Sequence, residues 1–152
     1  MIKKFFILIY VIFLSGCGYQ PIYQNLSNTD YNILIKEING DRDINNLLVS
    51  KLKSYNSNNT DKNYEITINS IYNKEIVAKD TTGAATEYKI IVSVNFKIIG
   101  SKLNKDLNFT EDFNMKSLSD KLEENDYEKN IKSTLINSIT RKLILELSKN
   151  ND

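Results

Sequence analysis

The sequence has no histidine, one cysteine and one proline among its 152 residues. Histidine is the commonest general base at neutral pH and the commonest transition-metal ligand, so its absence argues against both kinds of chemistry. A single cysteine excludes a disulfide within one chain, and its modification, argued below, would leave no thiolate for a metal. We therefore predict no catalytic residue, no metal site and no cofactor, and hence a protein that is not an enzyme.

An excess of charge of one sign is also lacking. The chain has 20 Lys and Arg residues against 19 Asp and Glu residues, for a formal net charge of +1. Nucleic-acid binding would require a basic stripe, whereas here both signs are spread along the chain, so we expect no nucleic-acid partner. After residue 16 there is no second long apolar segment, and a membrane-spanning helix needs about 20 such residues.

What the chain does have is a hydrophobic N-terminal segment that ends near its cysteine. Lys3 and Lys4 form a positively charged start, and residues 5–14 are all apolar. This layout is typical of a secretory signal, and the run is too short to span a bilayer. We predict that residues 1–16 are a signal peptide. Its removal takes away two lysines and leaves the mature chain with a net charge near −1.

The residues Leu14-Ser15-Gly16-Cys17 resemble the lipobox of bacterial lipoproteins. In that family the cysteine thiol receives diacylglycerol, the peptide is cut just before the cysteine, and the new amine is acylated, for example with palmitate. The resemblance implies that Cys17 is the lipid attachment site and anchors the protein to a membrane, since each buried CH₂ contributes about 0.8 kcal/mol. The alternative is a buried or reactive thiol at the end of an uncleaved anchor.

Residues 17–29 are predicted to be a lipidated N-terminus followed by an extended tether. Pro21 disfavours a helix, and Asn25, Ser27 and Asn28 favour turns. The remaining residues, 30–152, are enough for one domain with its own core. We therefore expect a single folded domain held to the membrane by its first residue.

The domain is predicted to begin with a strand and a short helix. Tyr31, Ile33 and Ile35 occupy alternate positions, which is typical of a strand. After a turn at residues 39–41, with Asp41 or Asp43 as N-cap, apolar residues recur at helical spacing. They are Ile44, Leu47, Leu48, Leu52 and Tyr55. The polar residues 54–62 then predict a loop.

Three more strand patterns follow, separated by turn signals. Alternation starts at Tyr64 and is clearest over residues 88–98, whose even-numbered members are all apolar. The turn residues 80–83 between these two patterns predict an antiparallel hairpin. In the fourth pattern Leu107, Phe109, Phe113 and Met115 are expected to face inward, and Glu111 is an exception that the sequence does not explain.

The last predicted element is a long helix that begins near Ser117 or Ser119 as N-cap. Its apolar residues step by four from Tyr127 to Leu147, which is the stripe of a helix packed on a sheet. The sequence therefore predicts an α/β two-layer sandwich, in the order β-α-β-β-β-α. A four-stranded mixed sheet is covered on one face by two helices, with the first pairing parallel or separated by another strand.

The chain also resembles one family, the lipopolysaccharide-assembly lipoproteins called LptE, in its alphaproteobacterial form. The likeness begins at residues 16–23 (GCGYQPIY), is clearest at residues 82–88 (TGAATEY), and continues to Arg141-Lys142-Leu143. It implies the two-layer fold and a lipid-anchored place at the outer membrane, with the domain on the periplasmic side or within a barrel lumen. It also implies two partners: the β-barrel LptD, which members help to assemble and plug, and lipopolysaccharide.

The resemblance further implies basic contacts to lipopolysaccharide in two regions. One region holds Lys79, and the other holds Lys116 and Lys121 at slightly displaced positions. A lysine can bind a phosphate as a point charge, although these three can equally be solvated surface lysines. A second function also stays open, namely a lipid-tethered periplasmic binding or adaptor module of another envelope complex. A lipid carrier would need an enclosed apolar cavity, whereas the regular alternation indicates a filled core.

Overall fold

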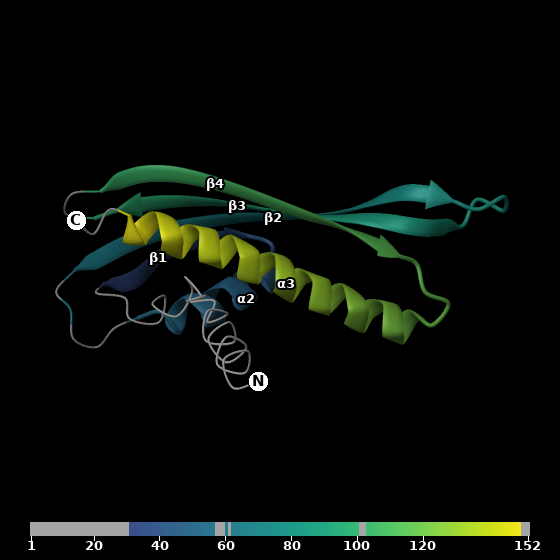
Figure 1. The fold of residues 1–152 in the computed structure, drawn as a ribbon, viewed down its shortest axis with the longest axis horizontal. Helices are drawn as coiled ribbons and strands as arrows, with labels where there is room; N and C mark the ends of the chain where they lie inside the picture. Colours follow the sequence, from purple (N-terminus) through teal and green to yellow (C-terminus); the bar gives the residue numbers. More distant parts are fainter. Residues whose placement is uncertain (1–30, 57–59, 61, 101–102, 150–152) are drawn as a thin grey trace, which may run out of the picture.

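The computed structural model describes residues 31–56, 60, 62–100 and 103–149. They form, in chain order, β1 (Asn32–Gly40), α2 (Arg42–Lys53), β2 (Asn63–Lys79), β3 (Ala85–Ile99), β4 (Asn104–Lys116) and α3 (Lys121–Ser148). The predicted order β-α-β-β-β-α is confirmed, and both helices lie on the same side of the sheet (Figure 1). The predicted signal peptide, the lipidation site Cys17 and the tether lie outside the described residues.

The sheet is mixed, with the strands in the order β1-β2-β3-β4. β1 pairs with β2 in parallel, and α2 is the crossover between them. β2, β3 and β4 form an antiparallel meander. Of the two arrangements that the sequence allowed for the first strand, the direct parallel pairing is therefore the one found.

The core is formed where the alternating strand residues meet the apolar stripes of both helices. The predicted inward residues of β3 from Ile90 to Ile98 are all buried, and Tyr88 is partly buried. α3 contributes most of the predicted stripe, with Tyr127 at its edge 37% exposed. These faces pack because period-2 and period-3.6 patterns each place apolar side chains on one side of their element. The core between the sheet and the helices is thus filled by apolar side chains.

The turn from β1 into α2 is fixed by Gly40 and Asp41. Gly40 has φ +100°, and a Cβ there would lie 1.9 Å from the carbonyl oxygen of Ser70 on β2. Only glycine allows this approach without moving the backbone. Asp41 is the N-cap, as one of the two predicted candidates, and its carboxylate accepts from the Ile44 N–H at 2.9 Å.

The predicted N-cap of α3 was wrong. The cap is Asp120, whose carboxylate accepts from the backbone N–H groups of Leu122 and Glu123. The Ser117 hydroxyl instead donates to the Glu124 carboxylate at 2.8 Å, so this serine orders the connection before the helix. Phe113 was expected inside but is 41% exposed, with its ring edge-on to Tyr127 at 6.5 Å between centroids.

The molecule has two ends that differ in what covers the sheet. We call the proximal part β1 and α2 together with residues 63–70, 92–99 and 135–148. We call the distal part residues 72–79 and 85–90, which form the outer hairpin, together with residues 121–132 of α3. In Figure 1 the hairpin extends beyond the helices on the right, while β1 and α2 lie on the left.

Candidate functional site

The tip of the distal hairpin is a turn organised by Asp80. Its carboxylate accepts hydrogen bonds from the Thr82 N–H at 2.8 Å, the Thr82 hydroxyl at 2.6 Å and the Ala84 N–H at 3.0 Å. The bonds from Thr82 are the main reason that the pKa of Asp80 lies below its usual value. Gly83 completes the turn with φ +88°. The tip is therefore a defined, exposed structure and not a loose loop.

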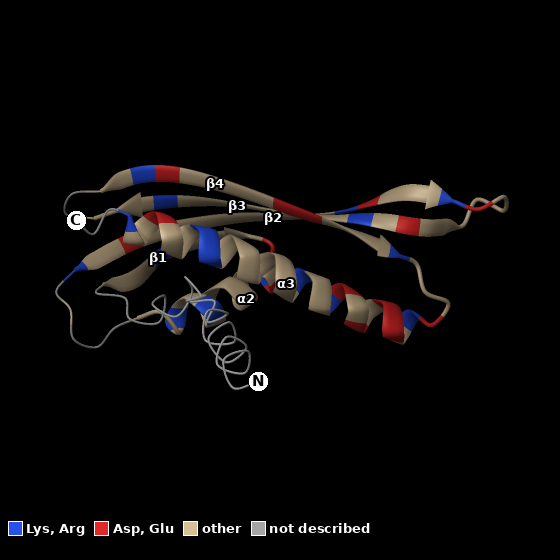
Figure 2. Ribbon diagram, viewed as in Figure 1, with Lys and Arg blue, Asp and Glu red and all other residues tan. Residues whose placement is uncertain are grey.

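All three lysines that the family resemblance singled out lie at the distal end. Lys79 ends β2 beside the tip, and Lys116 ends β4 opposite Glu87 of β3. Lys121 is 70% exposed at the start of α3, and its ammonium lies 3.2 Å from the Glu124 carboxylate. Within the described residues neither Lys79 nor Lys116 forms an ion pair. Basic and acidic residues are interspersed at this end (Figure 2), so the lysines share an end but do not form a purely basic patch.

The sequence analysis missed a cluster of charged and aromatic side chains between α3 and the hairpin. Glu128 of α3 accepts from the Tyr72 hydroxyl at 2.7 Å and from the Lys74 ammonium at 2.8 Å, and the Lys132 ammonium lies 2.9 Å away. Lys74 also lies 4.2 Å from the centroid of the Tyr88 ring, close enough for a cation–π contact. We call Tyr72, Lys74, Tyr88, Glu124, Glu128 and Lys132 the distal cluster.

The two carboxylates of the distal cluster are held ionised. Burial opposes ionisation of Glu128, but hydrogen bonds from Lys74, Lys132 and Tyr72 outweigh it and lower its pKa to about 2. Glu124 is only 4% exposed, and hydrogen bonds from the Leu118 N–H and the Ser117 hydroxyl lower its pKa to about 2. Burial and the bond to Glu128 raise the pKa of Tyr72. The cluster therefore stays charged at neutral pH and fixes α3 against the hairpin.

A signal for this cluster exists in the sequence. Tyr72 and Lys74 continue the inward face of β2 after Ser70, so the pattern changes from apolar to polar along one face. Glu124, Glu128 and Lys132 are spaced by four and lie on one side of α3. The β2 stretch and the α3 stretch each place polar side chains on a face that is otherwise inward. This shared feature could have suggested that the two stretches contact each other.

Glu111, unexplained by the sequence, pairs with Lys142 of α3. Its side chain points inward from β4, opposite Val92 in the register, and is 20% exposed. A carboxylate on an inward face is acceptable when a cation from the covering element reaches it. Glu111 therefore joins the β4 edge to the helix and has a structural role.

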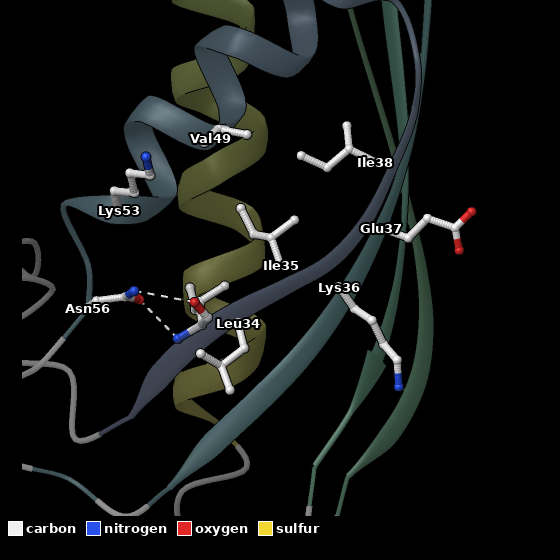
Figure 3. A pocket seen from close by; sticks show the side chains of 9 residues that line it. Leu34, Ile35, Lys36, Glu37, Ile38, Val49, Lys53 and Asn56 are labelled. Carbon is white, nitrogen blue, oxygen red and sulfur yellow. Dashed lines mark hydrogen bonds between the residues drawn. The ribbon is translucent and has the colours of Figure 1, made fainter.

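A groove runs along the outer edge of β1, beside α2 (Figure 3). Ile35, Ile38 and Val49 give it an apolar floor, whereas Lys36 and Glu37 point away from the helix. The Asn56 side chain closes one end by accepting from the Ile33 N–H at 2.9 Å and donating to the Ile33 carbonyl at 3.2 Å. The groove is open along its length and so lacks the enclosed form that a lipid carrier would need.

Two further observations concern the described residues alone. No three His, Cys, Asp or Glu side chains gather there closely enough to hold a metal ion. Among these same residues, no helix combines the length and the apolar character needed to cross a membrane.

Comparison with known proteins gives a family and a fold. The family model LptE, described as lipopolysaccharide-assembly, matches residues 27–143. The crystal structure of rare lipoprotein B from Shewanella oneidensis is similar, with 12% identity and a TM-score of 0.52, covering 77% of this chain and 100% of that one. A minor lipoprotein from Acinetobacter baumannii has 15% identity and a TM-score of 0.52, covering 78% of this chain and 94% of that one. No curated protein matches the chain.

Proposed function

Because the chain belongs to the LptE family of lipopolysaccharide-assembly proteins, we propose that it is an outer-membrane lipoprotein that helps to assemble and plug the β-barrel LptD. In this role it contributes to the delivery of lipopolysaccharide to the cell surface. The match over residues 27–143 is the observation that carries the proposal. Residues 82–88, at the hairpin tip and the start of β3, are the basis for proposing the alphaproteobacterial type. Such a protein is an assembly factor and not an enzyme.

The surface of the domain suits a plug. The lumen of a large outer-membrane barrel is polar, so a domain inside it needs a mixed polar exterior. Charged residues make up 26% of the chain, and both signs are interspersed over the helices and strands (Figure 2). The described apolar side chains are gathered mainly in one core between the layers. Composition of this kind permits the role, and the family match supports it.

Depletion and co-purification test the proposal. Depleting the protein should lower the amount of correctly assembled barrel in the outer membrane, and the barrel should co-purify with the tagged chain from detergent-solubilised membranes. Normal barrel levels together with no co-purification would contradict the proposal. That result would favour the alternative of a tethered adaptor for another envelope complex.

The anchor is tested by changing Cys17 to Ala. We expect this variant to incorporate no labelled fatty acid, because it removes the thiol that the lipobox resemblance assigns to lipidation. Wild-type protein should fractionate with the outer membrane. Label retained by the Cys17→Ala protein would contradict the lipid attachment site, and wild type found only in the inner membrane would contradict the location.

The candidate lipopolysaccharide contacts are tested by changing Lys79, Lys116 and Lys121 together to Glu. These side chains lie at one end of the molecule and can each offer a positive charge to a phosphate. We expect weaker binding of the purified protein to lipopolysaccharide and little change in stability, because exposed charges contribute about 1 kcal/mol or less.

A matched control is the change of three other exposed lysines, Lys36, Lys53 and Lys149, to Glu. It alters net charge equally but away from the distal end. Equal loss of binding in both triple variants would indicate a general charge effect and would contradict the three assigned residues.

A further inference from the structure

The face of the sheet opposite the helices is not covered by any described element (Figure 1). Residues directly paired across strands point to the same face, so the register shows which side chains share it. Near the middle of this face two neighbouring rows cross β2, β3 and β4. We call their six residues the central patch: Asn69, Asn95 and Asn108 in one row, and Ile71, Ser93 and Thr110 in the next.

The central patch has no charged residue, although 26% of the chain is charged. Charges return in the rows on either side of it. Towards the proximal end the next row contains Lys97 and Asp106, and towards the distal end it contains Asp112, which pairs with Lys89 at 3.3 Å. The open face therefore has an uncharged centre between two charged borders.

This distribution of charge is similar to the one found at protein interfaces. Interface centres are depleted of charge and their rims are polar, because burying an unpaired charge costs far more than burying an amide that finds a hydrogen-bond partner. A face that meets only water has no such need. The helix face differs, since its exposed residues include Arg42, Asp43, Lys53, Glu123 and Asp126.

The side chains of the patch leave bonding capacity for a partner. Within the described residues, the amides of Asn69 and Asn108 form no hydrogen bond. Ser93 and Thr110 bond to each other at 2.9 Å. Ile71 is 53% exposed and adds one large apolar contact beside them.

We propose that the central patch packs against the inner wall of the partner β-barrel, with the helices turned away from that wall. The proposal rests on the proposed function. The inner wall of such a barrel is polar and can offer donors and acceptors to the amides of the patch. The uncovered strand surface can lie along the strands of the wall over all three patch strands. In this orientation the charged helix face points towards the water in the lumen.

The change Asn69→Arg tests the proposal by placing a charge at the centre of the patch. The matched control is Asn46→Arg, which makes the same exchange at an exposed position of α2. Full-length variants are expressed in cells, and the barrel that co-purifies from detergent-solubilised membranes is quantified. We expect Asn69→Arg to lower the recovered barrel about tenfold or more, as for a disrupted interface centre, and Asn46→Arg to leave it unchanged. Asn69→Gln should also retain it.

Thermal unfolding of the purified full-length variants checks that the fold is intact. If Asn69→Arg is unfolded, a photoreactive side chain at residue 108 decides, with residue 46 as its control. Cross-links to the barrel from residue 108 and not from residue 46 support the proposal. Cross-links to the barrel from residue 46 only, or from residue 108 to lipopolysaccharide only, overturn it.

The two proposals fail differently. If wild type recovers the barrel and a folded Asn69→Arg variant recovers it equally, the central patch is not the contact, while the proposed function stands. If wild type itself recovers no barrel and its depletion leaves barrel levels normal, the proposed function fails, and the inference fails with it.

Discussion

In the proximal part, α2 and the second half of α3 meet the sheet chiefly through apolar side chains, whereas in the distal part the first half of α3 adds carboxylates, lysines and tyrosines to the buried Ile90 and Ile131. Ile68, Phe96, Leu48 and Leu143 are completely buried in the proximal part. At the distal end Ile76 and Val77 of the hairpin are each more than half exposed. The same two-layer arrangement is thus maintained by different interactions at its two ends.

The different contacts at the two ends indicate different roles. One end supplies stability, and the other fixes the orientation of α3. Burial of apolar surface contributes about 25 cal/mol per Å² and does not depend strongly on direction. A buried ion pair contributes less net stability, since removing charges from water offsets much of their attraction, but it requires one geometry. We infer that the proximal part supplies most of the stability, and that the distal cluster sets the position of α3 relative to the hairpin.

The largest expected effect comes from breaking the proximal core with Leu143→Ala. Leu143 is fully buried, so we expect a loss of about 2–5 kcal/mol in the free energy of unfolding. Leu145→Ala, two residues further along the same helix, is the control, because Leu145 is 39% exposed and should cost under about 1 kcal/mol. Chemical denaturation measures both. Similar losses for the two variants would contradict the packing face of α3.

A smaller effect is expected from breaking the distal cluster with Glu128→Gln. Three donors lose a charged acceptor, so we expect a loss of about 2 kcal/mol at neutral pH. The loss should be local, with faster hydrogen exchange in residues 121–132 and little change in residues 135–148. The control is Glu123→Gln, which alters an exposed carboxylate in the first turn of the same helix. If Glu128→Gln changed the hydrogen-exchange rates equally in residues 121–132 and 135–148, the proposed difference between the two parts would be contradicted.

The same variant should change the response to acid. The pKa of Glu128 is lowered from 4.5 to about 2, so its ionised form stabilises the folded state. This contribution is complete above the unfolded pKa and is lost as the pH falls through the folded pKa near 2. Wild type should therefore lose stability on acidification, and Glu128→Gln should lose less of it. Identical pH profiles for the two proteins would contradict the role of Glu128.

The smallest effect is expected at the Glu111–Lys142 pair, which is partly exposed and joins β4 to α3. We expect Glu111→Gln and Lys142→Met each to cost about 1 kcal/mol or less, and a double-mutant cycle to give a coupling in the same range. Such a result would show that an ion pair outside the distal cluster contributes little to stability. A coupling energy larger than that between Glu128 and Lys74 would contradict the special role of the distal cluster.

Several features could be predicted because their signals are local in the chain. The inward residues of β3 alternate within one stretch, and the stripe of α3 recurs every four residues, so both faces were identified correctly. The N-cap of α3 was not, since Ser117, Ser119 and Asp120 are all acceptable caps by type. The choice depends on Glu124, whose carboxylate engages Ser117 and leaves Asp120 to cap the helix.

By itself the sequence determined the order of the elements, the faces they bury and the family to which the chain belongs. Only the tertiary structure decided that β1 pairs directly with β2, that Glu111 meets Lys142, and that Tyr72 meets Glu128 across 56 positions of the chain. The physical reason is that periodicity acts over two to four residues, whereas these contacts depend on strand register and on how α3 crosses the sheet. For the same reason, the six scattered residues of the central patch become one uncharged surface only when three strands are aligned.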